Sequence, residues 1–267
     1  MSDTSGWVLK KEVVSTPAST LDPVSILLSC QHSDGALLVA EYIIGEMKTN
    51  IQSQTCETIR YLLDYKYKRL KEWQQLPWYK QLFVPMPRPD LITASALWLE
   101  KVYKGHLWDH KPLIRDNPSL KAVAVHRKLW TLAKVRAYRQ NKKPNDKPPT
   151  DSKSYWHKYK RHDYFYDIWS NVHYGYVGLA CGFSQELLLR GAGGAQFLDN
   201  MTTSGDAPDD VIAVKVGFKL YQDYGDSLAT LTPPELMKRL EQASFSDAAR
   251  DIHLCFHPHR KELENES

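Results

Sequence analysis

The chain has 267 residues, of which 42% are hydrophobic and 25% are charged, and its formal net charge is +4. The apolar fraction supports a buried core, whereas the absence of any run of about 18 apolar residues excludes a membrane-spanning helix. The segment 1–12 lacks the apolar stretch of a secretory signal peptide, so export from the cell would require a dedicated machine.

Helical periodicity dominates the beginning of the chain. We expect residues 1–24 to be irregular, with a short strand at Val13 and Val14. Apolar residues that recur at helical spacing predict one helix over 36–48 and a second over 51–76.

A Pro-rich loop over 77–89 separates these helices from the next one. Thr93 or Ser95 is expected to cap that helix, because short hydroxyl side chains accept hydrogen bonds from free helix N–H groups. The helix is predicted to run to about Tyr103 and to end at Gly105.

The middle of the chain is also predicted to be helical. Apolar spacing favours a helix over 119–139, followed by a polar, Pro-rich connector over 141–154. We expect another helix from Tyr155 to about Gly182, despite its many aromatic residues. Ser184 is expected to cap the helix after it.

Two further helices are expected before the C-terminal tail. One is predicted to start at Asp206 or Pro208 and to run to Gly225. Pro233 favours a short helix that opens at Thr232, because proline is well suited to the first helical position.

Helical patterns far outnumber strand patterns, and no internal repeat occurs. We therefore predict a mainly α fold, a single lysozyme-like or irregular helical domain with an N-terminal helical extension. The extension is assigned to 1–80, the catalytic domain to 81–256 and a flexible tail to 257–267.

Basic residues are concentrated between Lys121 and Arg161, where 13 Lys and Arg residues stand against only Asp146 and Asp151. A segment this basic attracts polyanions such as nucleic acid, teichoic acid, an anionic membrane or an acidic protein. A solvated helix face with a basic loop explains the same charges without a partner, and both interpretations stay open.

The segment 163–196 is dense in aromatic residues, glycines and isolated polar residues. Gly175, Gly178 and Gly182 are spaced three and four residues apart, which places them on one face of a helix. Close helix packing explains this spacing. The alternative is a binding site, lined by four polar residues: Asn171, His173, Tyr174 and Gln196.

Three blocks follow one another in a fixed order: GHLWDHK at Gly105–Lys111, an aromatic and Gly-rich block at Trp169–Gln196, and GDAPDD at Gly205–Asp210. Together they resemble the bacterial polymorphic toxin type 44 domain over about residues 85–225. Ser170 and His173 differ from the family pattern. The resemblance implies a secreted antibacterial effector toxin, cargo of a contact-dependent secretion apparatus, with a cognate immunity protein in the producer.

Glu100 and Asp109 are the first candidates for catalysis, with a spacing similar to the acid and its partner in phage-type lysozymes. Glycan cleavage needs one protonated and one ionised carboxyl group. Trp98 and Trp108 could desolvate Glu100 and raise its pKa. A chance pairing of two acidic residues is the alternative.

Further site residues are expected from the same blocks. His173 is a candidate general base, against the alternative of a hydrogen-bonded core histidine. Lys111 either holds Asp109 ionised or forms a plain structural ion pair. The remaining candidates would bind substrate, through hydrogen bonds of side-chain amides or through ring stacking. They are Trp108, Asn171, Tyr174 and Gln196.

Asp209 and Asp210 are expected to cap a helix, with a catalytic role as the alternative. The cysteines, Cys30, Cys56, Cys181 and Cys255, are widely spaced and form no CxxC motif. They are expected to be buried thiols, or to form one disulfide in an oxidising compartment. We predict no metal site and no cofactor, because the tail histidines (His253, His257 and His259) lack complementary ligands.

Three functions remain open at this stage. The first is a muramidase-like peptidoglycan hydrolase delivered to the target-cell periplasm, with Glu100 and Asp109 as catalytic groups. The second is a metal-independent nuclease in the target cytoplasm, with His173 as base and Lys111 or Arg190 on the phosphate. The third is a non-enzymatic cargo or adaptor. An acidic immunity protein would suit the basic segment.

Overall fold

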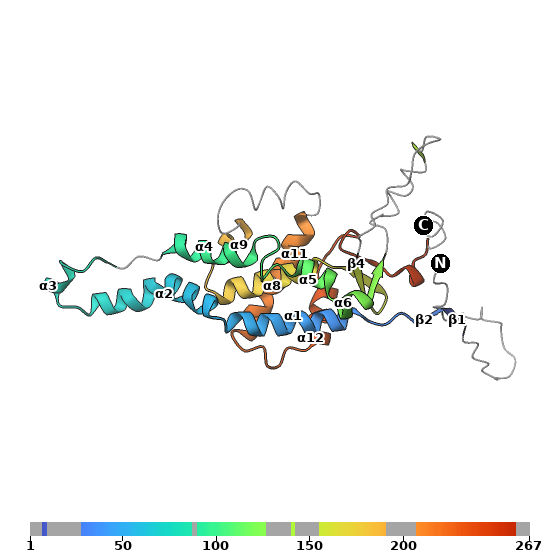
Figure 1. Ribbon diagram of the computed structural model, residues 1–267, viewed down its shortest axis with the longest axis horizontal. Coiled ribbons are helices and arrows are strands. Elements are labelled where there is room, and N and C mark those ends of the chain that lie inside the picture. Colours follow the sequence, from blue (N-terminus) through green and yellow to red (C-terminus); the bar gives the residue numbers. More distant parts are fainter. Residues whose placement is uncertain are drawn as a thin grey trace, which may run out of the picture.

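The computed structural model describes residues 7–9, 28–86, 90–126, 140–141, 155–190 and 207–259 (Figure 1). The fold is mainly α, as predicted, with a small antiparallel sheet toward one end. In these ranges no helix is both long enough and apolar enough to cross a bilayer.

Helix α8 (Ile168–Ala180) forms the centre of the molecule and is buried over most of its surface. It lies between α1 (Ala36–Ile51) and α11 (Ala207–Tyr224), and α12 (Pro233–Gln242) packs on α1 (Figure 1). Such a helix must be apolar around its whole circumference, which accounts for the aromatic density of this segment.

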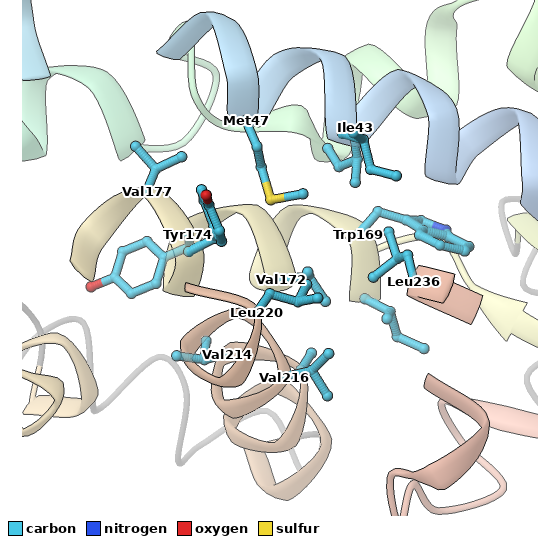
Figure 2. Close-up of a cluster of buried hydrophobic side chains, with 14 of the residues drawn as sticks. Ile43, Met47, Trp169, Val172, Tyr174, Val177, Val214, Val216, Leu220 and Leu236 are labelled. Carbon is cyan, nitrogen blue, oxygen red and sulfur yellow. The ribbon is translucent and has the colours of Figure 1, made fainter. Parts of the chain in front are cut away.

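Figure 2 shows the side chains that fill the space between these helices. Ile43 and Met47 project from α1 toward Trp169 and Val172 on α8, and the opposite side of α8 meets α11. α1 therefore shares one continuous core with the helices of the toxin-like segment. Predicted helix 36–48 is confirmed, with three more residues at its C-terminus.

Glycines allow α8 and α11 to approach backbone to backbone. A Cβ atom on Gly175 would overlap the carbonyl oxygen of Val214, and one on Gly217 would overlap that of Val172. The sequence left two explanations for the glycine spacing, close helix packing and a binding site. The position of Gly175 against α11 agrees with close helix packing. Gly178 faces Leu188 instead.

Helices α2 (Gln54–Gln74), α3 (Trp78–Gln81) and α4 (Leu91–Val102) form an extension beside the core, with α2 packed on α4 (Figure 1). The predicted helix 51–76 corresponds to α2. The predicted caps of α4 are wrong, because Asp90 accepts the hydrogen bond from the Thr93 N–H group at 2.9 Å.

Two short helices, α5 (His110–Asp116) and α6 (Pro118–Ala122), follow α4 and are capped by Asp109 and Asn117. Helix α9 (Gln185–Arg190) is capped by Ser184, as predicted, through the Leu187 N–H group.

Strands β3 (Ala124–His126), β4 (Tyr155–Tyr159), β5 (His162–Phe165) and β6 (Arg250–Ile252) form one antiparallel sheet in that order. The prediction of a helix starting at Tyr155 is therefore wrong for 155–165. Aromatic residues favour strands, and the β4–β5 hairpin aligns Trp156 with Phe165. Lys160 makes the turn with a positive φ of 53°.

Strands β1 (Trp7–Leu9) and β2 (Leu28–Cys30) form a separate antiparallel pair, and β2 contacts the 3₁₀ helix η1 (Leu254–Phe256). The predicted helix 119–139 is replaced by α6 and β3 up to His126. The rest of that helix, the strand at Val13 and Val14 and most of the connector lie outside the described residues.

Candidate functional site

Polar side chains from three separate segments meet near α5, α8 and α11. We call this set the polar cluster: Asp109, Lys111, Asp167, Asn171 and Asp210. Asp109 caps α5, and its carboxylate accepts hydrogen bonds from the N–H groups of Gly105 at 2.8 Å and Lys111 at 3.2 Å. Asp109 therefore fixes the turn that precedes Lys111.

Lys111 lies beside a carboxylate at the start of α8. Its Nζ is 3.8 Å from Oδ2 of Asp167, with the two side chains 34% and 17% exposed. Burial alone would lower the pKa of Lys111. The nearby groups of Asp167, Asp210, Tyr166 and Asp109 raise it by more than burial lowers it, so the net pKa is raised. Lys111 is therefore an ammonium group at neutral pH.

Asn171 connects the cluster to α11. Its Nδ2 donates a hydrogen bond of 2.6 Å to Oδ1 of Asp210, in the first turn of α11. The neighbouring Asp209 faces elsewhere, because it accepts a hydrogen bond of 2.8 Å from the N–H group of Ser246. The two adjacent aspartates thus have different roles, with only Asp210 in the cluster.

The cluster joins three predicted site residues, Asp109, Lys111 and Asn171, to Asp167 and Asp210. Besides Asp109, which caps α5, it offers two carboxylates around one ammonium group, with an amide that orients one of them. Such a set can bind a polar substrate and can exchange a proton with it.

Glu100 lies apart from this set, on the exposed side of α4. Its side chain is 60% exposed and accepts a hydrogen bond of 3.0 Å from Lys101. Glu100 and Asp109 line the same open depression of about 310 Å³. The exposed carboxyl of Glu100 lacks the desolvated surroundings that the two tryptophans were expected to supply.

Trp108 and Tyr174 are core residues in this structure. Both pack on Trp98, with ring centroids 5.6 and 5.2 Å from it. The Tyr174 hydroxyl donates to the carbonyl of Leu188 at 3.1 Å, and burial raises its pKa to about 12. Both side chains are buried, with 5% and 8% exposed, so they contribute to the core and present little surface for stacking.

His173 is fully buried beneath the same aromatic layer. The Asn50 amide donates to its Nε2 at 2.9 Å, and the ring of His110 lies 4.2 Å away between centroids. Burial, with the neighbouring His110, holds the pKa of His173 well below its usual value. His173 was predicted to be either a general base or a hydrogen-bonded core histidine, and this geometry agrees with the core histidine.

Gln196 lies outside the described residues, as do 127–139 and 142–154 of the basic segment. Two basic side chains in the described part of that segment form ion pairs with acidic residues of the same chain. Lys158 pairs with Asp34 at 2.5 Å and Lys160 with Glu241 at 3.2 Å.

Sequence reasoning missed Asp167, although a signal for it exists. Asp167 and Asn171 are four residues apart, so one turn of helix places them together. It also missed a cluster of Cys30, His32, His253 and Cys255, whose two halves are too distant in sequence for any spacing motif.

Comparison with known proteins agrees with the three blocks. Residues 97–223 match the family model described as bacterial toxin 44, a range that contains the whole polar cluster. No curated protein matches the chain, and no solved structure does so either. The segment 97–223 is therefore similar to bacterial toxin 44.

Proposed function

We propose that this bacterial toxin is a glycoside hydrolase that cleaves the glycan strands of peptidoglycan at the polar cluster. The main support for this proposal is that the carboxylates of Asp167 and Asp210 lie close to Lys111 and Asn171. These residues come from three segments that are far apart in sequence. Glycosidic cleavage needs two carboxyl groups with different protonation, one as acid and one as nucleophile or base.

The hydrogen bonds suggest how the two carboxyl groups divide these roles. Asn171 donates to Asp210 at 2.6 Å, and such a bond favours the ionised carboxylate. Lys111, whose Nζ lies 3.8 Å from Oδ2 of Asp167, places a positive charge beside the second carboxyl group. We therefore assign Asp210 as nucleophile or base, with Asp167 as the second carboxyl group of the reaction.

Glu100 and Asp109 give a second location for the same reaction, in their shared depression. Two features rank it below the polar cluster. Glu100 is mostly exposed, and both oxygens of Asp109 already accept hydrogen bonds from the backbone.

The nuclease alternative rests on the basic segment 121–161. Its proposed base, His173, has no route to a substrate because it is enclosed in the core. The carboxylates of the polar cluster would also repel a phosphate backbone. These two observations support our preference for glycan hydrolysis over the nuclease alternative.

The experiment compares matched variants on purified sacculi. Released fragments would be identified by mass spectrometry, with Asp167→Asn and Asp210→Asn set against Glu100→Gln. We expect losses of at least about 100-fold for the two Asn variants and little change for Glu100→Gln. The reverse order would move the reaction to the depression of Glu100 and Asp109.

Expression in two compartments separates the functional classes. A glycan hydrolase would kill when directed to the periplasm, with rounding and lysis of the cells. Killing from the cytoplasm with degraded RNA or DNA would favour the nuclease, and harmless expression in both compartments would favour a cargo or adaptor.

The same proposal includes delivery to the target-cell periplasm by a secretion apparatus and inhibition by a cognate immunity protein. An inhibitor that covers the polar cluster must approach α5 and the first turn of α11. Its affinity should then fall when Lys111 is replaced, whereas an inhibitor held by the basic segment would respond to charge reversal there.

A further inference from the structure

We propose that Cys30, His32, His253 and Cys255 bind one zinc ion that fastens β2 to the end of the sheet. The four residues form two short motifs, Cys-x-His and His-x-Cys, at opposite ends of the described chain. They share no residue with the polar cluster, so the inference is independent of the proposed hydrolase activity.

The ligand atoms converge as a tetrahedral ion requires. Nδ1 of His32 lies 3.2 Å from Sγ of Cys30, 3.2 Å from Nε2 of His253 and 3.4 Å from Sγ of Cys255. All four ligand atoms lie within 4.8 Å of one another. Zinc bonds of about 2.0–2.3 Å place tetrahedral ligands roughly 3.3–3.8 Å apart, close to these separations.

The backbone holds both motifs in place before any ion binds. Cys30 is the last residue of β2 and pairs with Trp7 of β1. His253 directly follows β6, and its N–H group donates to the carbonyl of Arg161 at 2.8 Å. Cys255 lies within η1, which contacts β2.

Asp163 supplies the outer-shell partner that zinc-binding histidines usually have. Its buried carboxylate accepts a hydrogen bond of 2.7 Å from Nδ1 of His253. With its proton on Nδ1, the His253 ring directs the lone pair of Nε2 toward the other three ligands. A carboxylate–histidine–zinc arrangement of this kind fixes the ring and strengthens the ligand.

The donor set indicates both the metal and its role. Two thiolates and two imidazoles in a tetrahedron favour zinc over magnesium or calcium, which prefer oxygen. Because four protein ligands complete the coordination, no position is left for water or substrate. The site is therefore structural, and it ties β2 to a segment more than 220 residues further along the chain.

Metal analysis of the purified full-length chain, without a histidine tag, tests the proposal. We expect about one zinc per chain in the wild type and none in the double variant Cys30→Ser, Cys255→Ser. The matched control replaces the other two cysteines, Cys56→Ala and Cys181→Ala, and should keep its zinc. Equal zinc in both double variants would overturn the proposal.

Two further measurements remain decisive even if the Cys30 and Cys255 variant fails to fold. Wild-type protein loaded with Co²⁺ should show thiolate-to-cobalt absorption and the visible bands of a tetrahedral site. Asp163→Asn should weaken zinc binding by about 10–100-fold in competition with a chelator. The site would be refuted if folded wild-type protein bound neither zinc nor cobalt when the ion was supplied in excess. It would also be refuted if Cys30 and Cys255 formed a disulfide that persisted in the presence of a reductant.

Discussion

Asn171 of α8 and Asp210 of α11 form a direct hydrogen bond of 2.6 Å, although they are 39 residues apart in sequence. The bond lies close to the place where Gly175 and Gly217 bring the two helix backbones together. The position of Asp210 is therefore determined by how these helices cross.

Replacing Asn171 with Leu tests the importance of this bond. The change removes the amide donor but keeps a similar volume, so Asp210 loses the hydrogen bond that orients it. A hydrogen bond to a charged group is worth about 2 kcal/mol, which corresponds to roughly a thirty-fold loss in the rate of sacculus digestion. Unchanged activity in a normally folded variant would remove Asn171 from the site.

The helix crossing itself is testable through glycine substitutions. Gly217→Ala would drive a methyl group into the backbone of α8 at Val172, and we expect a loss of about 3 kcal/mol in the free energy of unfolding. Gly45→Ala is the matched control, because no atom lies within 4 Å of the added Cβ on α1. That change should stabilise the protein by about 0.5–1 kcal/mol in urea denaturation. Equal effects of the two changes would argue against a tight crossing.

Buried histidines predict a loss of stability in mild acid. Burial lowers the pKa of His110 and of His157 to about 4, and that of His173 also falls well below its usual value. As pH falls below about 6.5, the unfolded chain takes up protons that the folded chain does not. The stabilisation present above that pH is therefore lost progressively between about 6.5 and 4.

The measurement is the urea midpoint at pH 7.5 and at pH 5. Each of His110 and His157 contributes up to roughly 3 kcal/mol across the full window, so the midpoint should fall clearly. His110→Asn should reduce the slope with pH, whereas replacement of the exposed His106 should not. A flat profile in the wild type would contradict the neutral, buried state of these rings.

Cys56 and Cys181 are placed to form a disulfide under oxidising conditions. Their sulfur atoms lie 3.0 Å apart in the core, and neither is disulfide-bonded in this structure. The hydrogen bond from Cys181 lowers the pKa of Cys56, whereas that bond and burial raise the pKa of Cys181. Cys56 is thus the thiol that attacks first.

Peptide mapping after mild oxidation should therefore find Cys56 joined to Cys181. Closing a loop of 125 residues should add about 4 kcal/mol to the free energy of unfolding, an increase that Cys181→Ala abolishes. The sequence left the pairing of the four cysteines open, and a different pairing would reject this choice.

Local patterns were sufficient to predict several elements. Ser184 and Thr232 cap helices as expected, because their side chains satisfy N–H groups only a few positions away. The glycine spacing indicated close packing correctly for Gly175, whereas Gly178 faces Leu188 and Gly182 lies beyond the end of α8 with a positive φ. The family was also recognisable from three short blocks in order.

Long-range contacts were beyond such patterns. The aromatic run from Tyr155 to Phe165 fits a helix or a hairpin, and pairing with β6 decides between them. His173 could be placed in the core only once Asn50, 123 residues away, was known to bind it. Asp210 could be separated from Asp209 only by their partners, Asn171 and Ser246.

The glycine contact between α8 and α11 also determines when the Asn171–Asp210 pair can form. An isolated α8 carries Asn171 and an isolated α11 carries Asp210, but neither helix alone contains the pair. Only docking of the two backbones, which any larger side chain at Gly217 obstructs, brings the pair together. Under the proposed function, a newly made or partly unfolded chain lacks this site, and an immunity protein that covers the polar cluster would bind only copies that have completed their tertiary structure.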